Sequence, residues 1–182
     1  MRCTTDLLWG AGLLLVAGVS LVAVAAAPEA PPQSGLRSGT ELSFYYFTSS
    51  NCHYCQDPQI VAAVIKAKEL VAARAKADGM LFAFRGVAVE DDIPRGLATL
   101  NEVGPLDELS VGRNAFNTAN IAMRLTSGIP PHDRTGIPAI IFFQRKLVFD
   151  KQGVAAGEPK YLGSVMGTAI VPWANDGAPV PP

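Results

Sequence analysis

The chain has 182 residues, a length that favours one globular domain with an extension at either end. Fifteen Lys and Arg residues against 16 Asp and Glu residues leave a net charge of −1, which excludes a strongly basic nucleic-acid binder and an acidic disordered protein. Apolar residues make up 49% of the chain, enough for a hydrophobic core, and three cysteines are too few for a dense disulfide scaffold or a four-thiolate zinc site.

The N-terminal region contains an uncharged, apolar run at residues 7–27. As a helix this run would be about 31 Å long, close to the hydrocarbon thickness of a bilayer. Its closing alanines also offer cleavage sites of the A-x-A type. We therefore expect residues 1–27 to be either a signal peptide or an N-terminal membrane anchor. In both cases the rest of the chain is exported, periplasmic or secreted, and meets the membrane only through this segment.

The remaining boundaries follow from composition. Residues 28–39 are rich in Pro, Ser and Gly and are predicted to form a linker, and residues 174–182 to form a flexible tail. Residues 40–173 then make up the globular domain. Because Cys3 lies in the leader, Cys52 and Cys55 are the two cysteines of this domain.

The domain opens with a strand, helix, strand pattern. Residues 41–47 and 81–89 are apolar runs typical of buried strands, and residues 59–77 carry apolar side chains at helical spacing. Such an order predicts a parallel pair of strands with a right-handed crossover. The less regular region 90–133 is predicted to hold two helices, over residues 95–102 and 111–127. We then expect a strand at 138–143, a turn at 144–146, an antiparallel strand at 147–149 and a last helix at 159–171.

A Cys-x-x-Cys motif, Cys52-His53-Tyr54-Cys55, lies between the first strand and the first helix. Free backbone N–H groups at a helix start favour an anion, and a protonated His53 adds positive charge, so Cys52 is expected to ionise more readily than a free cysteine. A thiolate at Cys52 attacks a substrate disulfide, and Cys55 is placed to resolve the mixed disulfide. A purely structural disulfide and half of a metal site are the two other interpretations of this pair.

A proline, Pro138, stands at the entrance to the apolar run 139–143. Proline donates no hydrogen bond to a strand ladder and is therefore unusual at this place. A cis peptide bond between Ile137 and Pro138 accounts for it, and an ordinary trans proline at the first residue of a strand is the alternative.

The aromatic run 44–47, the Cys52-His53-Tyr54-Cys55 motif and Gly136-Ile137-Pro138 before an apolar strand resemble the thioredoxin superfamily in identity and order. The resemblance covers residues 41–89 and 134–171. It implies an α/β, thioredoxin-like fold in which helices flank a central mixed sheet, with a helical insert at 90–133 before the cis-proline strand.

The resemblance also implies a function, that of an exported Dsb-type thiol–disulfide oxidoreductase. In such a protein Cys52 is the nucleophile, Cys55 is the resolving thiol that pairs with it as a disulfide, and Tyr54, Ile137 and Pro138 contribute to the substrate groove. The partners implied are protein thiols or disulfides and a second dithiol protein that restores the redox state. No cofactor, metal or nucleic acid is expected.

Two alternative functions belong to other classes. One is a binding or assembly module that keeps the fold but has a redox-inert pair. The other is an exported copper-handling protein, for which His132 is the candidate additional ligand. One departure from the resemblance bears on whether the protein reduces or oxidises its substrates, since Tyr46 stands where thioredoxin has a buried aspartate. That substitution argues against efficient thioredoxin-like reduction.

Overall fold

The structure, a computed structural model, describes residues 37–126, 128–131 and 136–181. Its strands are β1 (Gly39–Thr48), β2 (Leu81–Ala88), β3 (Glu108–Val111), β4 (Ala139–Asp150), β5 (Gly153–Ala156) and β6 (Lys160–Met166). Its helices are α1 (Pro58–Ala77), α2 (Ile93–Asn101), α3 (Thr118–Asn120) and α4 (Ile170–Asn175). Further short helical segments lie between these elements: η1 (His53–Gln56), η2 (Asn114–Phe116), η3 (Ile121–Thr126, π-helical) and η5 (Gly167–Ala169).

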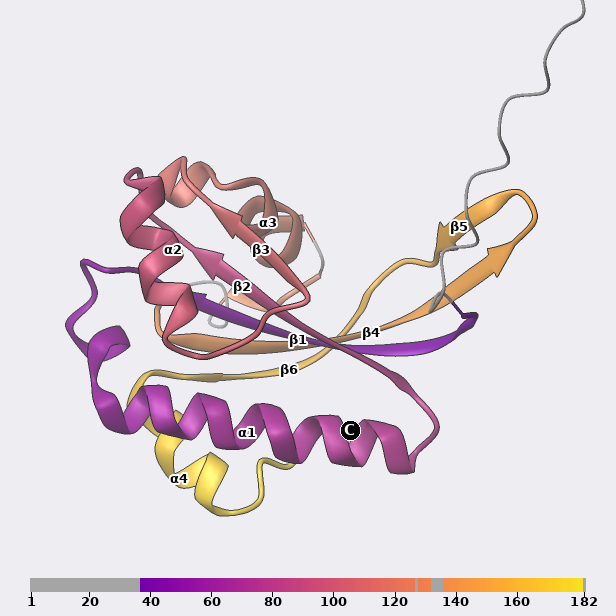
Figure 1. The fold of residues 1–182 in the computed structure, drawn as a ribbon, viewed down its shortest axis with the longest axis horizontal. Coiled ribbons are helices and arrows are strands. Elements are labelled where there is room, and N and C mark those ends of the chain that lie inside the picture. Colours follow the sequence, from indigo (N-terminus) through magenta and orange to yellow (C-terminus); the bar gives the residue numbers. More distant parts are fainter. Residues whose placement is uncertain (1–36, 127, 132–135, 182) are drawn as a thin grey trace, which may run out of the picture. The chain divides into compact units, whose positions relative to one another are not determined.

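Within the described residues the strands form one mixed, six-stranded sheet (Figure 1). Its order is β3-β2-β1-β4, and β5 and β6 both pair with β4, along different parts of its length. Strands β1, β2 and β3 are parallel, whereas β4 runs antiparallel to β1. The central position of β1 explains the aromatic run at residues 44–47, because a strand covered on both faces carries apolar side chains on both of them.

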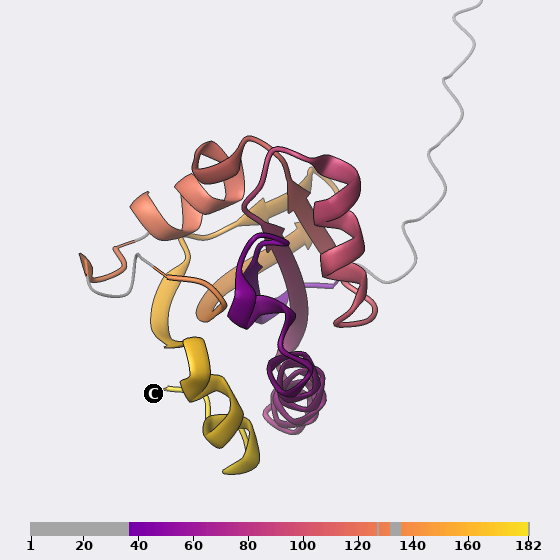
Figure 2. The same ribbon diagram turned by 90° about the vertical axis from the view of Figure 1, so that its left-hand side faces the viewer.

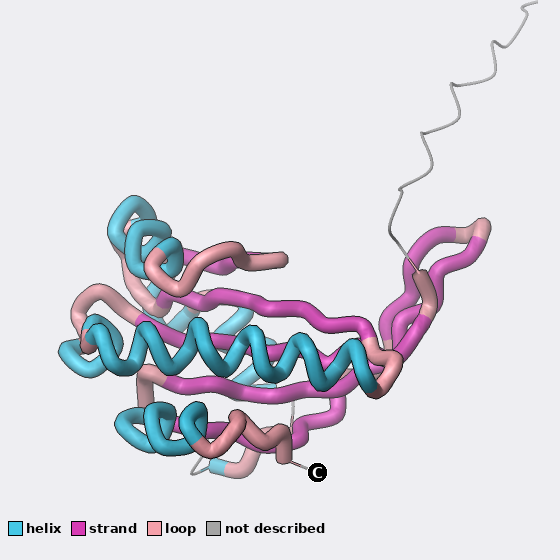
Figure 3. Tube along the Cα trace, turned by 60° about the horizontal axis from the view of Figure 1, so that its bottom comes forward, coloured by secondary structure: helices cyan, strands magenta, loops and turns pink. Residues whose placement is uncertain are grey.

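The side chains of β1 alternate between two hydrophobic layers. Phe44 and Tyr46 join the layer that α1, α2 and α4 cover, whereas Tyr45 and Phe47 join the layer that includes residues from α3 and η3 (Figure 2). Helix α1 runs along the length of the sheet in Figure 3. Helices thus flank a central mixed sheet on both faces, and the α/β, thioredoxin-like fold class is confirmed.

Helix α1 lies within one residue of its predicted bounds. Asp57 caps its first turn by accepting a hydrogen bond from the N–H of Gln59 at 2.8 Å. Pro58 is tolerated at the first helical position because no helical hydrogen bond is needed from its nitrogen. At the other end Gly79 takes the left-handed φ of 69° that follows many helices.

The predicted turn at residues 144–146 is wrong. Strand β4 continues through these residues to Asp150, and its last four residues form a hairpin with β5 that extends from the body of the sheet (Figure 1). Polar side chains are present at 144–146 because the strand leaves the core there. Arg145, for example, donates a hydrogen bond to Glu41 on the neighbouring strand at 2.9 Å.

The predicted helix at residues 159–171 is also wrong over most of its length. Residues 160–166 are the strand β6, which pairs antiparallel with β4, and helix formation is confined to η5 and α4. Gly163 lies in this strand opposite the C-terminal residues, where an added Cβ would stand 2.5 Å from Cγ of Pro181. Residues 160–166 form a strand because they pair with β4 and pack against Pro181, and both of these partners are distant in the sequence.

The insert at 90–133 is only partly helical. Helix α2 confirms the first of its predicted helices, but residues 108–111 form β3 and extend the sheet beside β2. The second predicted helix is divided into η2, α3 and η3.

The C-terminal residues are packed, so the predicted flexible tail is wrong for residues 174–181. Ala178 is fully buried, and Arg74 of α1 donates hydrogen bonds to the carbonyl oxygens of Ala178 and Gly177 at 3.0 and 3.1 Å. The indole of Trp173 donates to the carbonyl oxygen of Pro179 at 3.0 Å.

The predicted leader at 1–27 and most of the linker at 28–39 lie outside the described residues. Across the described part of the chain, none of the helices combines the length and the hydropathy that a membrane span requires.

Candidate redox site

The Cys-x-x-Cys motif lies in a tight loop between β1 and α1. The N–H of Cys52 donates to the carbonyl oxygen of Ser49 at 3.1 Å, and the N–H of Cys55 donates to the carbonyl oxygen of Cys52 at 3.0 Å. The first bond closes the turn that leads into the motif, and the second opens the single 3-10 turn η1. Asp57 separates η1 from α1, so the motif precedes the long helix rather than opening it.

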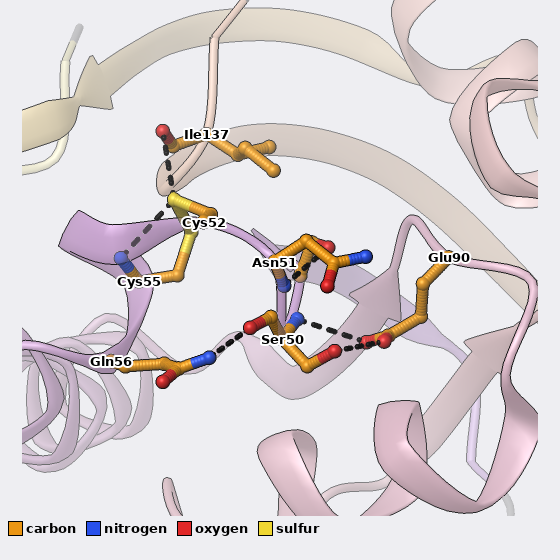
Figure 4. The surroundings of a disulfide bond; sticks show 8 residues. Ser50, Asn51, Cys52, Cys55, Gln56, Glu90 and Ile137 are labelled. Carbon is orange, nitrogen blue, oxygen red and sulfur yellow. Dashed lines mark hydrogen bonds between the residues drawn. A yellow bond between two sulfur atoms is a disulfide. The ribbon is translucent and has the colours of Figure 1, made fainter.

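Cys52 and Cys55 are joined in a disulfide whose Cα atoms are 5.2 Å apart (Figure 4). Their environments differ, because Cys55 is only 1% exposed whereas Cys52 is half-buried. The backbone N–H of Cys55 donates to Sγ of Cys52 at 3.2 Å. A donor at this place favours negative charge on the Cys52 sulfur.

The second part of the site comes from the segment before β4. The peptide bond between Ile137 and Pro138 is cis, and Pro138 is buried. The carbonyl oxygen of Ile137 lies 3.5 Å from Sγ of Cys52 (Figure 4). The fold thus brings together two segments that are 85 residues apart in the chain.

His53 and Tyr54 occupy the two positions between the cysteines and are both exposed. Their rings meet edge to face with centroids 5.7 Å apart, and Tyr54 leaves 55% of its surface free. Residues 52–55 and 137–138 of the predicted redox site therefore lie close together, and the rings of His53 and Tyr54 are exposed.

Sequence reasoning missed Glu90 and Ser50. Glu90 follows β2 and is 2% exposed, and its carboxylate accepts hydrogen bonds from both the N–H and the hydroxyl of Ser50 (Figure 4). The side-chain amide of Gln56 donates to the carbonyl oxygen of Ser50. A signal was present, because Glu90 follows a buried parallel strand at the same edge as the Cys-x-x-Cys loop, where α/β proteins place functional residues.

Tyr46 is buried in the hydrophobic layer that α1 covers. Burial raises the pKa of its hydroxyl above the ordinary tyrosine value. The hydroxyl is therefore neutral at physiological pH, and this position supplies no carboxylate.

Among the described residues no group of three or more His, Cys, Asp and Glu side chains is arranged to hold a metal ion. The candidate copper ligand His132 lies outside the described residues.

No protein-family model matches this chain, and a search of curated proteins found no match. Among solved structures, the chain is similar to a secreted disulfide oxidoreductase of Mycobacterium tuberculosis described as homologous to E. coli DsbE. The two are 14% identical with a TM-score of 0.36, over 75% of this chain and 80% of that one. At this level of similarity the neighbour's activity remains a statement about that protein.

Proposed function

We propose that this protein catalyses thiol–disulfide exchange with polypeptide substrates through Cys52 and Cys55. The observation that carries the proposal is the difference in exposure within one disulfide, because Cys52 is within reach of an incoming thiol and Cys55 is buried. Exchange needs one accessible sulfur to be attacked and a second one to leave, shielded from side reactions. A purely structural disulfide has no need of this asymmetry.

In the oxidised state, a substrate thiolate attacks Sγ of Cys52. A substrate–Cys52 disulfide forms as the Cys52–Cys55 bond breaks, and the electron pair passes to the sulfur of Cys55, which then takes up a proton. A second substrate thiolate attacks the substrate sulfur of this mixed disulfide, and Cys52 leaves as a thiolate. The substrate loses two electrons and the cysteine pair gains them. The reverse sequence reduces a substrate, and a second dithiol protein returns the pair to its starting state.

The surroundings of Cys52 support specific roles. The N–H of Cys55 stabilises a Cys52 thiolate, and a protonated His53 adds positive charge beside it. An extended substrate lying along Ile137 and Pro138 passes over Cys52, since the Ile137 carbonyl oxygen is next to its sulfur. The exposed ring of Tyr54, two residues after Cys52, offers apolar contact to a substrate.

The test uses two single variants, Cys55→Ser and Cys52→Ser, with a fluorescent peptide that contains one disulfide. We expect reduced Cys55→Ser protein to accumulate a mixed disulfide with the peptide through Cys52, because the resolving thiol is missing. Cys52→Ser protein should form little or none. Non-reducing electrophoresis and peptide mapping measure both. Equal trapping by the two variants, or trapping by neither, would refute the exchange mechanism and favour a binding module.

We also propose that the domain works outside the cytoplasm, where disulfides persist. The support is the apolar run at residues 7–27 of the sequence. Alkaline phosphatase fused after residue 39 should be active, since that enzyme requires export to fold. The N-terminal sequence of the recovered fusion distinguishes a cleaved signal peptide from a retained anchor, and an inactive fusion would contradict export.

A further inference from the structure

Glu90 is a buried acidic residue whose carboxylate is directed at the redox loop. Its Oε1 accepts the N–H of Ser50 at 3.1 Å, and its Oε2 accepts the hydroxyl of the same residue (Figure 4). Both oxygens therefore serve one residue, which stands two positions before Cys52. Hydrogen bonds to a charged acceptor are among the stronger ones in proteins.

Elements outside the redox loop hold Glu90 in place. Its carbonyl oxygen accepts the N–H of Asn114, in η2, at 3.2 Å. Helix α2 packs closely against its side chain at Gly96, where an added Cβ would lie 3.2 Å from Cγ of Glu90 and 3.1 Å from Cβ of Ala88. Strand β2, helix α2 and turn η2 thus form a rigid support for this carboxylate.

Ser50 connects that support to both sides of the cysteine pair. Its carbonyl oxygen accepts the side-chain amide of Gln56, one residue after Cys55. Its neighbour Ser49 accepts the N–H of Cys52 through the main chain. A displacement of Ser50 therefore moves Cys52 relative to the rest of the turn.

We propose that Glu90 is a positioning residue for thiol–disulfide exchange: by holding Ser50, it keeps the Cys52 sulfur beside the N–H of Cys55 and the carbonyl oxygen of Ile137. This inference rests on the proposed function and deepens it. Without the two hydrogen bonds, Ser50 loses its contacts with the segment that follows β2. The 3.2 Å contact between the Cys55 N–H and the Cys52 sulfur then weakens, and with it the stabilisation of a thiolate.

Substitutions separate the hydrogen bonds from the charge. Glu90→Ala removes both hydrogen bonds. Glu90→Gln keeps two, because the glutamine oxygen accepts the N–H of Ser50 and its amide donates to the Ser50 hydroxyl, which also accepts. Ser50→Ala removes one bond and leaves the charge. Asp91→Asn, at the exposed neighbouring residue, is the matched control for loss of one negative charge.

The experiment measures alkylation of Cys52 by iodoacetamide as a function of pH, in the full chain carrying Cys55→Ser. In this background Glu90→Ala should shift the alkylation midpoint upward by about half to one pH unit. It should also slow mixed-disulfide formation with the disulfide peptide by about tenfold. For Glu90→Gln and Asp91→Asn, the rate of mixed-disulfide formation should stay within about twofold of the parent's rate. The rate for Ser50→Ala should lie between those of the parent and Glu90→Ala.

Two results would overturn the proposal: a folded Glu90→Ala protein with the midpoint and rate of its parent, or a Glu90→Gln protein shifted as far as Glu90→Ala. Circular dichroism and cooperative melting establish folding. If Glu90→Ala does not fold, Ser50→Ala decides, and an unshifted Ser50→Ala midpoint counts against the proposal. Alkylation needs no substrate turnover, so failure of the exchange function itself appears separately, as the absence of a peptide adduct in the parent.

Discussion

The guanidinium of Arg85 faces the carboxylate of Glu41 across β1 and β2, donating from Nη1 at 3.1 Å and from Nη2 at 3.2 Å. Both residues are buried, at 7% and 6% exposure, near the end of β1 that is farther from the cysteines. Ser43 and Arg145 also donate to Glu41, and Arg85 lies over the ring of Tyr45. A buried charge pair of this kind is strongly destabilising when one partner is removed.

Arg85→Met is therefore expected to lower the free energy of unfolding by about 3 kcal/mol, because among the described residues it leaves Arg145 as the cationic partner of the buried Glu41. Arg145→Met is the control, since the Arg145 side chain is 28% exposed, and its effect should be about 1 kcal/mol or less. Urea denaturation of the oxidised proteins measures both. If the two substitutions lower the free energy of unfolding equally, the buried Arg85–Glu41 pair contributes no more to stability than the partly exposed Arg145–Glu41 pair.

Stability should fall in acid partly through Glu41. Burial by itself would raise the pKa of Glu41, but hydrogen bonds from Arg85 and Ser43 and the charges of Arg85 and Arg145 outweigh burial and lower the pKa. The pKa of Glu41 in the folded protein thus lies below the unfolded value of about 4.3. The contribution of ionised Glu41 to the free energy of unfolding is therefore present above that pH and is lost as pH falls through the folded pKa.

Glu41→Gln removes this titration. Its unfolding free energy should be lower than that of the parent at pH 7 and should decline less steeply below about pH 4.3. Urea midpoints between neutral pH and pH 3 provide the measurement. Parallel curves for the two proteins would exclude a linked titration of Glu41.

The two cysteines should differ in reactivity once the disulfide is reduced. We expect iodoacetamide to modify Cys52 at least about tenfold faster than Cys55, because Cys55 is 1% exposed. Peptide mapping after short exposure gives the two rates. Denatured protein serves as the control, in which the difference should largely disappear, and comparable rates in the folded protein would contradict the proposed assignment of roles.

Removal of residues 177–182 should destabilise the domain. The deletion exposes the contacts of Ala178 and takes away the two carbonyl acceptors of Arg74, an expected loss of about 2 kcal/mol. Arg74→Met in the full chain should reproduce part of it. Thermal melting of the three proteins gives the comparison, and a truncated protein that melts at the parent's temperature would mean that this packing contributes nothing.

The sequence by itself was sufficient for features whose causes are local. Helix α1 follows from the spacing of its apolar residues and from Asp57, Pro58 and Gly79 at its ends. The central strand β1 follows from the aromatic run at residues 44–47. The Cys52–Cys55 pair stands out by its Cys-x-x-Cys spacing, and Pro138 stands out by its place at the entrance to an apolar strand.

Tertiary structure decided what depends on partners distant in the chain. Residues 160–166 form a strand because the edge of β4 is available for hydrogen bonding. Residues 174–181 are packed because Arg74 donates a hydrogen bond to the Ala178 carbonyl oxygen and because Ala174 and Ala178 join the hydrophobic layer that α1 covers. The contact between Glu90 and Ser50 spans 40 residues, and no periodicity or local propensity encodes it. Only the packing of β2 beside β1 brings that carboxylate to the redox loop.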